Sequence, residues 1–362
     1  MRAVDVVITG GGPAGTAAAL SLRAHAPMLS VALVEATAYD RPRVGEVLPA
    51  LARGLLDQLG VLKTFEDERH RPAHSAAAAW GHPLLRENHF IYTTHGAGWH
   101  LDRARFDAFL AREARERGVE VHTRARVCAA SRSEDGWRLR LSGGEDLRAR
   151  FVVDASGRSA AFARGAGARR LAFDSLVAYA RFFTLDREPE HATLIEAFAE
   201  GWWYTALAGD RRVVMCLTDA DIARRLGLGD ERRWLGLLSE TSWIQRSVGR
   251  GVSVGSALTR AANSSRLEPV RAADWLAAGD AASTYDPLSS QGIVKSLRNG
   301  IFASYAVADL LLKSDTSGLT RYEKLARREF AAYARAHARY YAEERRWPES
   351  DFWRRRHRLF TQ

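Results

Sequence analysis

The stretch of sequence that decides the fold is Val4-Asp5-Val6-Val7-Ile8-Thr9-Gly10-Gly11-Gly12-Pro13-Ala14-Gly15. Residues 4–9 form an apolar run typical of a buried strand, and the alanine-rich residues 14–24 predict a helix. Between them lie three glycines with the spacing G-x-G-x-x-G. A second apolar run, residues 30–34, ends in Glu35, about 20 residues beyond the last glycine. The pattern predicts a strand, a tight loop, a helix and a second, parallel strand.

Each glycine of this loop has its own physical role. Gly10 allows the tight turn, Gly12 lets the backbone approach a pyrophosphate because it has no Cβ, and Gly15 lets the helix pack closely on the strand. The helix N-terminus, which begins with Pro13 and Ala14, then faces the phosphates. The acid after the second strand, Glu35, would accept both ribose hydroxyls and repel a 2′-phosphate. A glycine-rich turn without a ligand is the alternative, but the complete pattern favours a cofactor that contains ADP.

Length and composition restrict the class of protein. A chain of 362 residues exceeds the size at which a single core stops growing, so we expect two domains that share an interface. No basic and apolar leader precedes the first strand, and no apolar run approaches the roughly 18 residues that span a bilayer. We therefore expect a cytoplasmic protein without a transmembrane segment. Cys128 and Cys216 fit no metal-binding spacing, so no metal site is expected.

The chain is basic, with a net charge of +10. The arginine excess is densest in residues 321–358, whose pattern is typical of an amphipathic helix with a solvated face. Docking of an acidic partner or substrate is the alternative explanation. No nucleic-acid-binding module is visible, so a nucleic-acid partner is not expected.

A second group of motifs lies about 270 residues beyond the glycine loop. It consists of Gly279-Asp280 and of Asp286-Pro287-Leu288-Ser289-Ser290-Gln291-Gly292, where a long helix is predicted to begin. Together with the glycine loop and with Asp154-Ala155-Ser156-Gly157-Arg158-Ser159, these motifs resemble the flavoprotein monooxygenase superfamily. That superfamily includes para-hydroxybenzoate hydroxylase, geranylgeranyl reductases and flavin-dependent halogenases. The resemblance covers nearly the whole chain and implies FAD as the cofactor.

The resemblance also implies residues that hold FAD. Asp280, after Gly279, would bind the ribityl and pyrophosphate region. Residues 287–292 would lie beside the flavin ring, with the helix that begins at Gln291 or Gly292 aimed at its N1/C2 edge. A positive helix end at that place stabilises a reduced, anionic flavin. Further expected cofactor contacts are Arg41, Arg43, Arg105 and Asp154.

The implied fold class is α/β, with a Rossmann-like FAD-binding domain interleaved with a mostly antiparallel-sheet substrate domain and followed by a C-terminal helical segment. Strand patterns in residues 176–185, 192–199, 201–207 and 212–218 predict the antiparallel sheet. The expected FAD-binding domain comprises residues 1–75, 101–170 and 258–313. The substrate domain comprises residues 76–100 and 171–257, and residues 314–362 form the C-terminal helices.

Finer features resemble one branch of this superfamily. Val44-Gly45-Glu46-Val47-Leu48-Pro49 resembles a segment that flanks the flavin ring in halogenase-like proteins. Residues 74–81, the stretch around Trp99-His100 and Gly201-Trp202-Trp203-Tyr204 resemble the LodB, GoxB and QhpG type of flavoprotein. Those proteins modify a tryptophan in a partner polypeptide during the biogenesis of tryptophylquinone cofactors. The resemblance thus implies an aromatic substrate, possibly a tryptophan-containing peptide or protein.

Two departures separate the chain from tryptophan halogenases. Ser289 stands where their motif carries a glutamate, and Gln291 stands where it carries a threonine. Their tryptophan-rich motif is also absent. Their active-site lysine cannot be aligned with this chain: Lys63 is the only lysine among the first 100 residues, and it has the pattern of a surface lysine at a helix end. We therefore do not expect hypohalous chemistry.

The resemblance implies hydroxylation of an electron-rich aromatic group by a C4a-hydroperoxyflavin, with O₂ as co-substrate. Glu46 could act as an acid or base or cap a helix, and His100 could orient substrate or be structural. Pro287, Ser289 and Gln291 complete the expected catalytic region. Expected substrate contacts are Trp99, Trp202, Trp203 and Tyr204, with core packing as the alternative.

No second nucleotide-binding fold is visible, so electrons would come from transiently bound NAD(P)H or from reduced flavin supplied by a separate flavin reductase. Two other functions compete with hydroxylation of a peptide. One is a monooxygenase, oxidase or halogenase-like enzyme that acts on a small natural product. The other is a non-catalytic flavoprotein scaffold.

Overall fold

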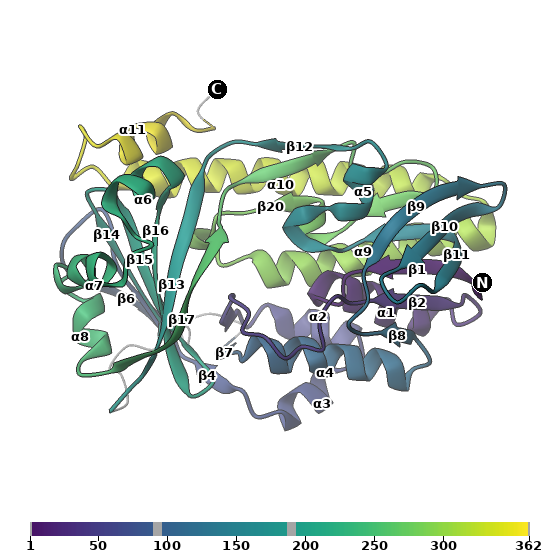
Figure 1. Cartoon of the computed structure of the whole chain (residues 1–362), viewed down its shortest axis with the longest axis horizontal. Helices are drawn as coiled ribbons and strands as arrows, with labels where there is room; N and C mark the ends of the chain where they lie inside the picture. Colours follow the sequence, from purple (N-terminus) through teal and green to yellow (C-terminus); the bar gives the residue numbers. More distant parts are fainter. Residues whose placement is uncertain (1, 90–95, 187–192, 361–362) are drawn as a thin grey trace.

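The computed structural model describes residues 2–89, 96–186 and 193–360. Its two large sheets lie at opposite ends of the long axis, and the helix α10 (Ser317–Glu343) runs past both of them (Figure 1). This arrangement of helices and sheets confirms the predicted α/β fold class with C-terminal helices.

The first sheet carries the glycine loop. Its order is β8-β2-β1-β11-β10-β9, and β19 also pairs with β11. The strands β8, β2, β1, β11 and β19 are parallel, whereas β10 and β9 pair antiparallel. The bounds are β1 (Arg2–Thr9), β2 (Val31–Val34), β8 (Glu120–His122), β9 (Val127–Ser133), β10 (Gly136–Leu141), β11 (Asp146–Asp154) and β19 (Trp275–Ala277). The predicted unit of strand, loop, helix and parallel strand is confirmed in β1, α1 (Pro13–His25) and β2.

Helices cover this sheet and bring segments from both halves of the chain together. α1 packs along α9 (Gly292–Lys313) and also contacts α4 (Arg103–Glu116). The approach of α1 and α9 is close because Gly300 has no side chain, and a Cβ there would lie 2.3 Å from the carbonyl oxygen of Ala14. The remaining short helices of this part are α2 (Ala52–Gln58), α3 (Leu62–Asp67) and α5 (Ala161–Gly165).

The second sheet has the order β17-β13-β16-β15-β14-β5-β6 and is antiparallel except between β14 and β5. The bounds are β5 (Ser75–Ala79), β6 (Arg86–His89), β13 (Leu176–Thr184), β14 (Thr193–Phe198), β15 (Gly201–Ala208), β16 (Arg211–Asp219) and β17 (Val252–Ala261). The domain boundary predicted between 257 and 258 falls inside β17, which pairs with β13 from Val252 to Ala261. We therefore propose that the substrate unit extends to residue 261.

Smaller elements connect the two sheets. Two three-stranded sheets have the orders β12-β18-β20 and β3-β7-β4. Their strands are β3 (Val47–Leu48), β4 (Arg71–Ala73), β7 (Gly98–His100), β12 (Arg169–Ala172), β18 (Ser265–Glu268) and β20 (Ser283–Thr284). The region 219–243 contains two helices, α6 (Ala220–Leu226) and α7 (Glu231–Ser239), because Gly227 ends α6 with φ +70°. α8 (Ile244–Val248) follows them.

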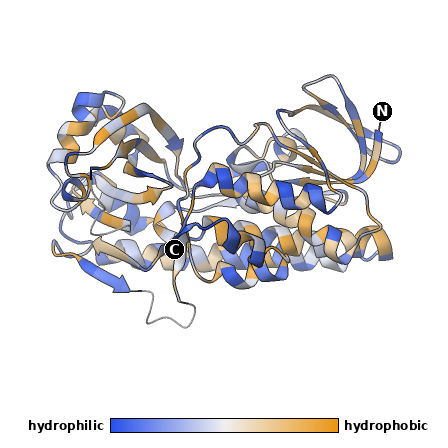
Figure 2. Cartoon of the chain, turned by 90° about the horizontal axis from the view of Figure 1, so that it is seen from below, coloured by the Kyte–Doolittle hydropathy of each residue, from blue (hydrophilic) through white to orange (hydrophobic). Residues whose placement is uncertain are grey.

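The C-terminal helices pack on both units. α10 lies along α9, and α11 (Asp351–Arg358) places Phe352 and Trp353 in the core that lies against the second sheet. Hydrophobic and hydrophilic residues alternate along the helices (Figure 2), as expected when one face is buried and the other solvated. None of the helices in the described ranges is both long and apolar enough to span a membrane.

We predict that Gly300→Ala lowers the free energy of unfolding by about 1–3 kcal/mol, because the new methyl group forces α1 and α9 apart. Gly236→Ala is the matched control: Gly236 lies in α7, and a Cβ there has open space around it. That change should stabilise the helix by about 0.5–1 kcal/mol. Urea unfolding of both variants measures the difference, and equal effects would contradict the role given to the α1–α9 contact.

Candidate cofactor and substrate site

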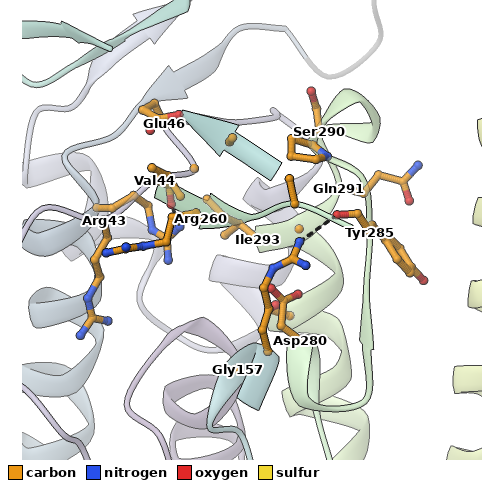
Figure 3. A pocket seen from close by; sticks show the side chains of 18 of the residues that line it. Arg43, Val44, Glu46, Gly157, Arg260, Asp280, Tyr285, Ser290, Gln291 and Ile293 are labelled. Atoms are coloured by element: carbon orange, nitrogen blue, oxygen red, sulfur yellow. Dashed lines mark hydrogen bonds between the residues drawn. The ribbon is translucent and has the colours of Figure 1, made fainter. Parts of the chain in front are cut away.

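A cavity of about 350 Å³ lies between the glycine loop, the N-terminus of α9 and one face of the second sheet. The two motifs that are about 270 residues apart in sequence both line it, through Gly12 and Pro13 on one side and Asp280 and Pro287 on the other. Figure 3 shows Gly157 and Asp280 toward one end of this cavity and Glu46 toward the other, with Ile293 between them. The cavity therefore connects the loop expected to hold phosphates with the sheet expected to hold substrate.

The glycine loop has the geometry that its sequence predicts. Gly10 has φ +106°, and a Cβ there would lie 2.2 Å from the carbonyl oxygen of Ala155. A Cβ on Gly15 would lie 1.9 Å from the carbonyl oxygen of Gly10, so the helix can pack on the strand only with glycine. A Cβ on Gly12 would meet no atom within 4 Å, and Gly12 lines the cavity. The open side of the loop thus leaves room for a pyrophosphate at the N-terminus of α1.

Glu35 lies beside this loop but does not line the cavity. Its Oε2 accepts a hydrogen bond of 2.8 Å from the backbone N–H of Gly11. Its Oε1 accepts one hydrogen bond of 2.8 Å from Arg43 and another of 3.0 Å from the backbone N–H of Thr37. The hydroxyl of Tyr39 donates to the carbonyl oxygen of Gly11. The carboxylate therefore already holds the loop in shape, and its contact with a ribose stays a prediction.

The predicted arginine contacts are only partly placed at the cavity. Arg43 lines it and pairs with Asp107 at 2.7 Å. Arg105 lies on the surface, where its Nε donates to Glu68 at 2.7 Å, and it does not line the cavity, so its contact with the cofactor stays a prediction. The reason is helical geometry: two residues along α4 turn a side chain to another face, and Arg103, which pairs with Asp107 one turn later, lines the cavity instead.

Asp154 does not line the cavity, and its contact with the cofactor stays a prediction. Its side chain is fully buried and accepts hydrogen bonds from the backbone N–H groups of Ser156 (2.9 Å) and Ala163 (2.8 Å). These bonds tie the end of β11 to α5. Its neighbours Ala155 and Gly157 line the cavity, so the segment contributes backbone there while the acid is structural.

The second motif contains an ion pair with a buried lysine that sequence reasoning missed. Lys295, 1% exposed, lies in the first turn of α9 and places Nζ 2.8 Å from Oδ1 of Asp280, whose side chain is 37% exposed. Burial opposes the ionisation of Asp280, but Lys295 and Arg158 outweigh it and keep the pKa of Asp280 below its ordinary value. A cation in the first turn of a helix is disfavoured by the helix dipole, so a lysine in the apolar first turn of α9 was the signal that an acid lies nearby.

The N-terminus of α9 opens onto the cavity. Gln291 caps the helix, and residues 287 and 289–293 line the cavity. The first backbone N–H groups of α9 have no acceptor within the helix, which makes this end a site for negative charge. The hydroxyl of Ser289 donates to the carbonyl oxygen of Asp286 at 2.8 Å and thus closes the preceding turn.

Buried tyrosine side chains of α10 hold the turn that begins at Asp286. Asp286 accepts a hydrogen bond of 2.7 Å from the hydroxyl of Tyr341, and its backbone N–H donates to the hydroxyl of Tyr333 at 2.9 Å. Tyr341 in turn accepts 3.0 Å from Nε1 of Trp202 in β15. The loop beside the helix end is thus tied both to α10 and to the second sheet.

Glu46 and Tyr204 are polar residues that line the cavity next to the second sheet. Glu46 is 2% exposed and lines the cavity together with Tyr204, and its Oε1 has no hydrogen-bond partner among the described residues. Burial raises the pKa of Glu46 to about 7. Near neutral pH the carboxyl group can therefore both give and take a proton.

His100 does not line the cavity. It is 3% exposed, and burial together with nearby Arg212, Arg71 and His74 lowers its pKa to about 4. The ring is therefore neutral at pH 7 and cannot act as an acid there. The structural alternative fits His100 better than the catalytic one.

Three of the four aromatic residues predicted to bind substrate lie in the core. Trp99 packs its ring 5.2 Å from Phe65 in the first unit, and Trp203 lies 5.1 Å from Trp234 behind the second sheet. Trp202 is fully buried against Tyr341. Only Tyr204 of this set lines the cavity, because alternate residues of β15 face opposite sides and Trp202 lies farther toward α10. In this structure the three tryptophans pack in the core, which was the alternative expectation for them.

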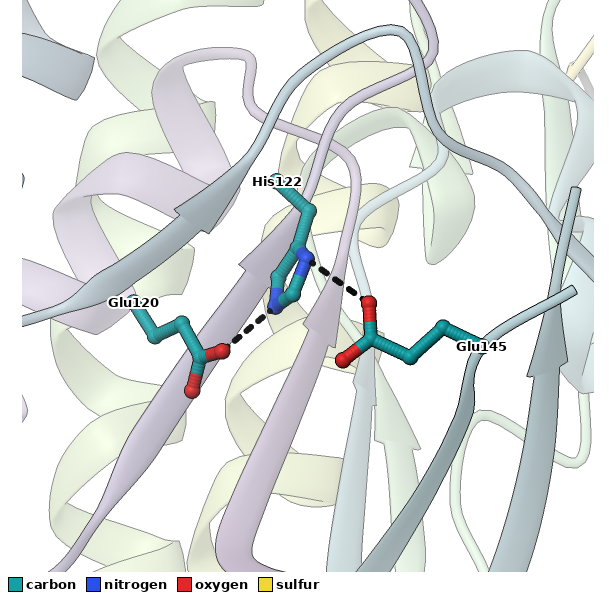
Figure 4. Close-up of side chains that lie close together, drawn as sticks. All are labelled: Glu120, His122 and Glu145. Atoms are coloured by element: carbon teal, nitrogen blue, oxygen red, sulfur yellow. Dashed lines mark ion pairs between the residues drawn. The ribbon is translucent and has the colours of Figure 1, made fainter. Parts of the chain in front are cut away.

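One group of possible metal ligands occurs in the described ranges, away from the cavity. His122 lies between Glu120 and Glu145, with Nε2 3.0 Å from the first and Nδ1 3.6 Å from the second (Figure 4). Glu120 also pairs with Arg2 at 2.9 Å. Since the two ring nitrogens face different carboxylates, the group has the form of a charge cluster at the edge strand β8.

Comparisons with known proteins agree with this site. A family model for an FAD binding domain matches residues 3–337. The FAD-dependent oxidoreductase LodB of Marinomonas mediterranea is 30% identical over 99% of this chain and 98% of its own length. The structure of the peptidyl tryptophan dihydroxylase QhpG, which is essential for tryptophylquinone cofactor biogenesis, shares 25% identity and a TM-score of 0.79, covering 98% of this chain and 79% of that one.

The myxobacterial halogenase CndH has the same fold, with a TM-score of 0.90 at 23% identity over 98% of this chain and 86% of that one. The open glycine loop and the free helix end fit FAD, so the residues present agree with the cofactor of these relatives. The chain therefore belongs to the FAD-binding-domain family and is an FAD-dependent oxidoreductase of the monooxygenase and halogenase type.

Proposed function

We propose that this protein hydroxylates an electron-rich aromatic group, namely the indole of a tryptophan in a partner polypeptide. The observation that carries the proposal is the cavity that runs from the glycine loop past the N-terminus of α9 to an apolar sheet face beside Glu46. The likeness to LodB and to the peptidyl tryptophan dihydroxylase QhpG supports a protein-bound tryptophan as substrate.

FAD, when bound, would supply the activation of O₂ and the transfer of an oxygen atom, with electrons from NAD(P)H or from reduced flavin. The chain would hold its pyrophosphate at Gly12, Pro13 and the N-terminus of α1. Asp280, which is held by Lys295, would accept hydrogen bonds from cofactor hydroxyls. The N-terminus of α9 would stabilise negative charge on the cofactor.

The second sheet would hold the aromatic ring of the substrate. Ala178, Met215 and Leu217 form an apolar surface on the cavity side, which excludes water from the reacting carbon. Glu46 lies next to Tyr204 at this surface. When an oxygen atom is added to a ring carbon, that carbon must lose its proton to restore aromaticity, and the carboxylate of Glu46 is placed to accept it.

The proposal is tested by loading the protein with FAD and supplying NADH, ¹⁸O₂ and a tryptophan-containing peptide. We expect mass spectrometry to show the peptide heavier by ¹⁸O, and to show no halogenated peptide when chloride or bromide is added. Hydrogen peroxide without oxygen incorporation would contradict a monooxygenase. A halogenated product would contradict the interpretation of Ser289 and Gln291.

Gly12→Val should give a folded protein that does not bind FAD. The side chain has room in the fold, since a Cβ at residue 12 meets no atom within 4 Å, but it would occupy the space of the pyrophosphate. Circular dichroism should match the wild-type protein, while the visible flavin absorption should be lost. A yellow Gly12→Val protein would refute the assignment of this loop.

Glu46→Gln should remove a pH dependence of hydroxylation. Because the pKa of Glu46 is raised to about 7, the fraction of proton-accepting carboxylate and hence the rate should rise as the pH increases from 6 to 8. The variant should be slower by roughly 10²-fold and lack this rise. Single-turnover measurements over this pH range decide, with Glu349→Gln on the surface as the matched control. A slow variant that keeps the rise would assign the pH dependence to another group.

A further inference from the structure

The strand β17 is an open edge of the second sheet. Within the described part of the chain the sheet order ends at β17, which pairs with β13 on one side only. None of its ten residues is buried, and Val252 is 67% exposed. An edge strand of this kind presents unpaired backbone N–H and C=O groups to which another chain can bind.

The end of β17 lies directly at the cavity. Arg260 and Ala261 line it, together with Ala262, which follows the strand. Pairing places Arg260 opposite Ala178, and Ala178 opposite Leu217. Residues that pair directly across a sheet point to the same face, so this row of side chains faces the cavity. A strand added outside β17 would continue the row, and its residue opposite Arg260 would point to the cavity as well.

The backbone of this segment has outward-facing groups. The N–H of Ala262 donates to the carbonyl oxygen of Leu176 at 2.9 Å, toward β13. Since the groups of an antiparallel strand alternate in direction, Arg260 also bonds toward β13, whereas Thr259 and Ala261 face outward. The outward carbonyl oxygen of Thr259 accepts a hydrogen bond of 2.9 Å from the guanidinium of Arg260, a side-chain donor of the same strand.

The part of β17 next to the cavity is also regular. The strand is irregular farther back, where Gly255 has φ +76° and the pairing register shifts near Ala180 and Phe182. Bulges of this kind protect edge strands against unwanted pairing. Residues 258–261 lie beyond the irregularity, so the protection does not extend to the cavity end.

We propose that the polypeptide substrate binds as an additional β-strand along residues 258–261 of β17 and thereby places its tryptophan, opposite Arg260, on the cavity face of the sheet. This inference rests on the proposed function, because it specifies how the protein substrate reaches the same cavity. Main-chain hydrogen bonds to Thr259 and Ala261 supply binding that is independent of the flanking sequence. The guanidinium of Arg260 is free to stack on the indole once a peptide N–H replaces it at the carbonyl oxygen of Thr259. The net charge of +10 favours acidic residues in the peptide.

The test measures binding of a probe peptide, acetyl-Glu-Val-Thr-Trp-Thr-Val-Glu-amide, to the FAD-loaded protein by calorimetry. Thr259→Pro removes the outward N–H, and edge strands tolerate proline where the N–H faces solvent. We expect this variant to bind the probe about 5–30-fold more weakly, which corresponds to the loss of a main-chain hydrogen bond. Thr259→Val, which keeps the N–H, is the matched control and should bind as the wild-type protein does. The FAD content and the melting temperature report whether each variant is folded.

A second measurement leaves the protein unchanged. Probes that are N-methylated at one backbone position after another should lose affinity at alternate positions, because only every second N–H of an added strand faces β17. Equal binding of the wild-type and Thr259→Pro proteins, or N-methylation effects without alternation, would overturn the docking proposal.

Oxygen incorporation into N-acetyltryptophanamide, which is too short to form a strand, separates the two proposals. Oxygen incorporation into this compound, together with probe binding that is insensitive to Thr259→Pro, would support the hydroxylase activity and refute docking of the substrate on β17. Probe binding that is weakened by Thr259→Pro, without oxygen incorporation into either compound, would support docking on β17 and refute the hydroxylase activity.

Discussion

The site depends on how closely the backbone around Gly279 and Gly300 approaches Ala14. A Cβ on Gly279 would lie 2.6 Å from Cβ of Ala14, and a Cβ on Gly300 would lie 2.3 Å from its carbonyl oxygen. Two glycines from the second half of the sequence thus pack directly against one alanine in the first turn of α1, because neither has a side chain. Any larger residue would separate α1 from α9, and the phosphate-binding loop and the helix end would no longer border one cavity.

This contact explains why two motifs distant in sequence act as one site, and also why the sequence predicted them well. Glycines and a strand-to-helix transition leave a pattern that is independent of side-chain orientation, so the loop at Gly12 and the start of α9 were both predictable. Charged residues leave no such pattern. Arg103 and Arg105 are equivalent in the sequence, and only the packing of α4 decides that the first faces the cavity and the second pairs with Glu68.

The same reasoning applies to the aromatic residues of β15. Consecutive residues of a strand point to opposite faces of the sheet. One face of this sheet packs against α7 and α8, and the other packs against α11 and borders the cavity. A run of Trp202, Trp203 and Tyr204 therefore cannot all line one pocket. The sequence contains the alternation but does not show which layer covers each face, so tryptophans suited to a substrate site proved to be core residues.

Two carboxyl groups at the cavity show how local partners decide the charge of an acid. Asp280 has Lys295 within 2.8 Å and remains ionised, whereas Glu46 lacks a close partner for its Oε1 and has its pKa raised to about 7. The first is a fixed negative group that lines the cavity, and the second is a group that can change its protonation state there, which fits the roles proposed for them. The two ends of one cavity are thus suited to different tasks, holding a ligand at one and moving a proton at the other. Relatives with this fold act on substrates of different kinds, so the fold alone does not select a substrate. In this chain the features that could select one are Glu46, the apolar row on the second sheet and the open strand at its edge.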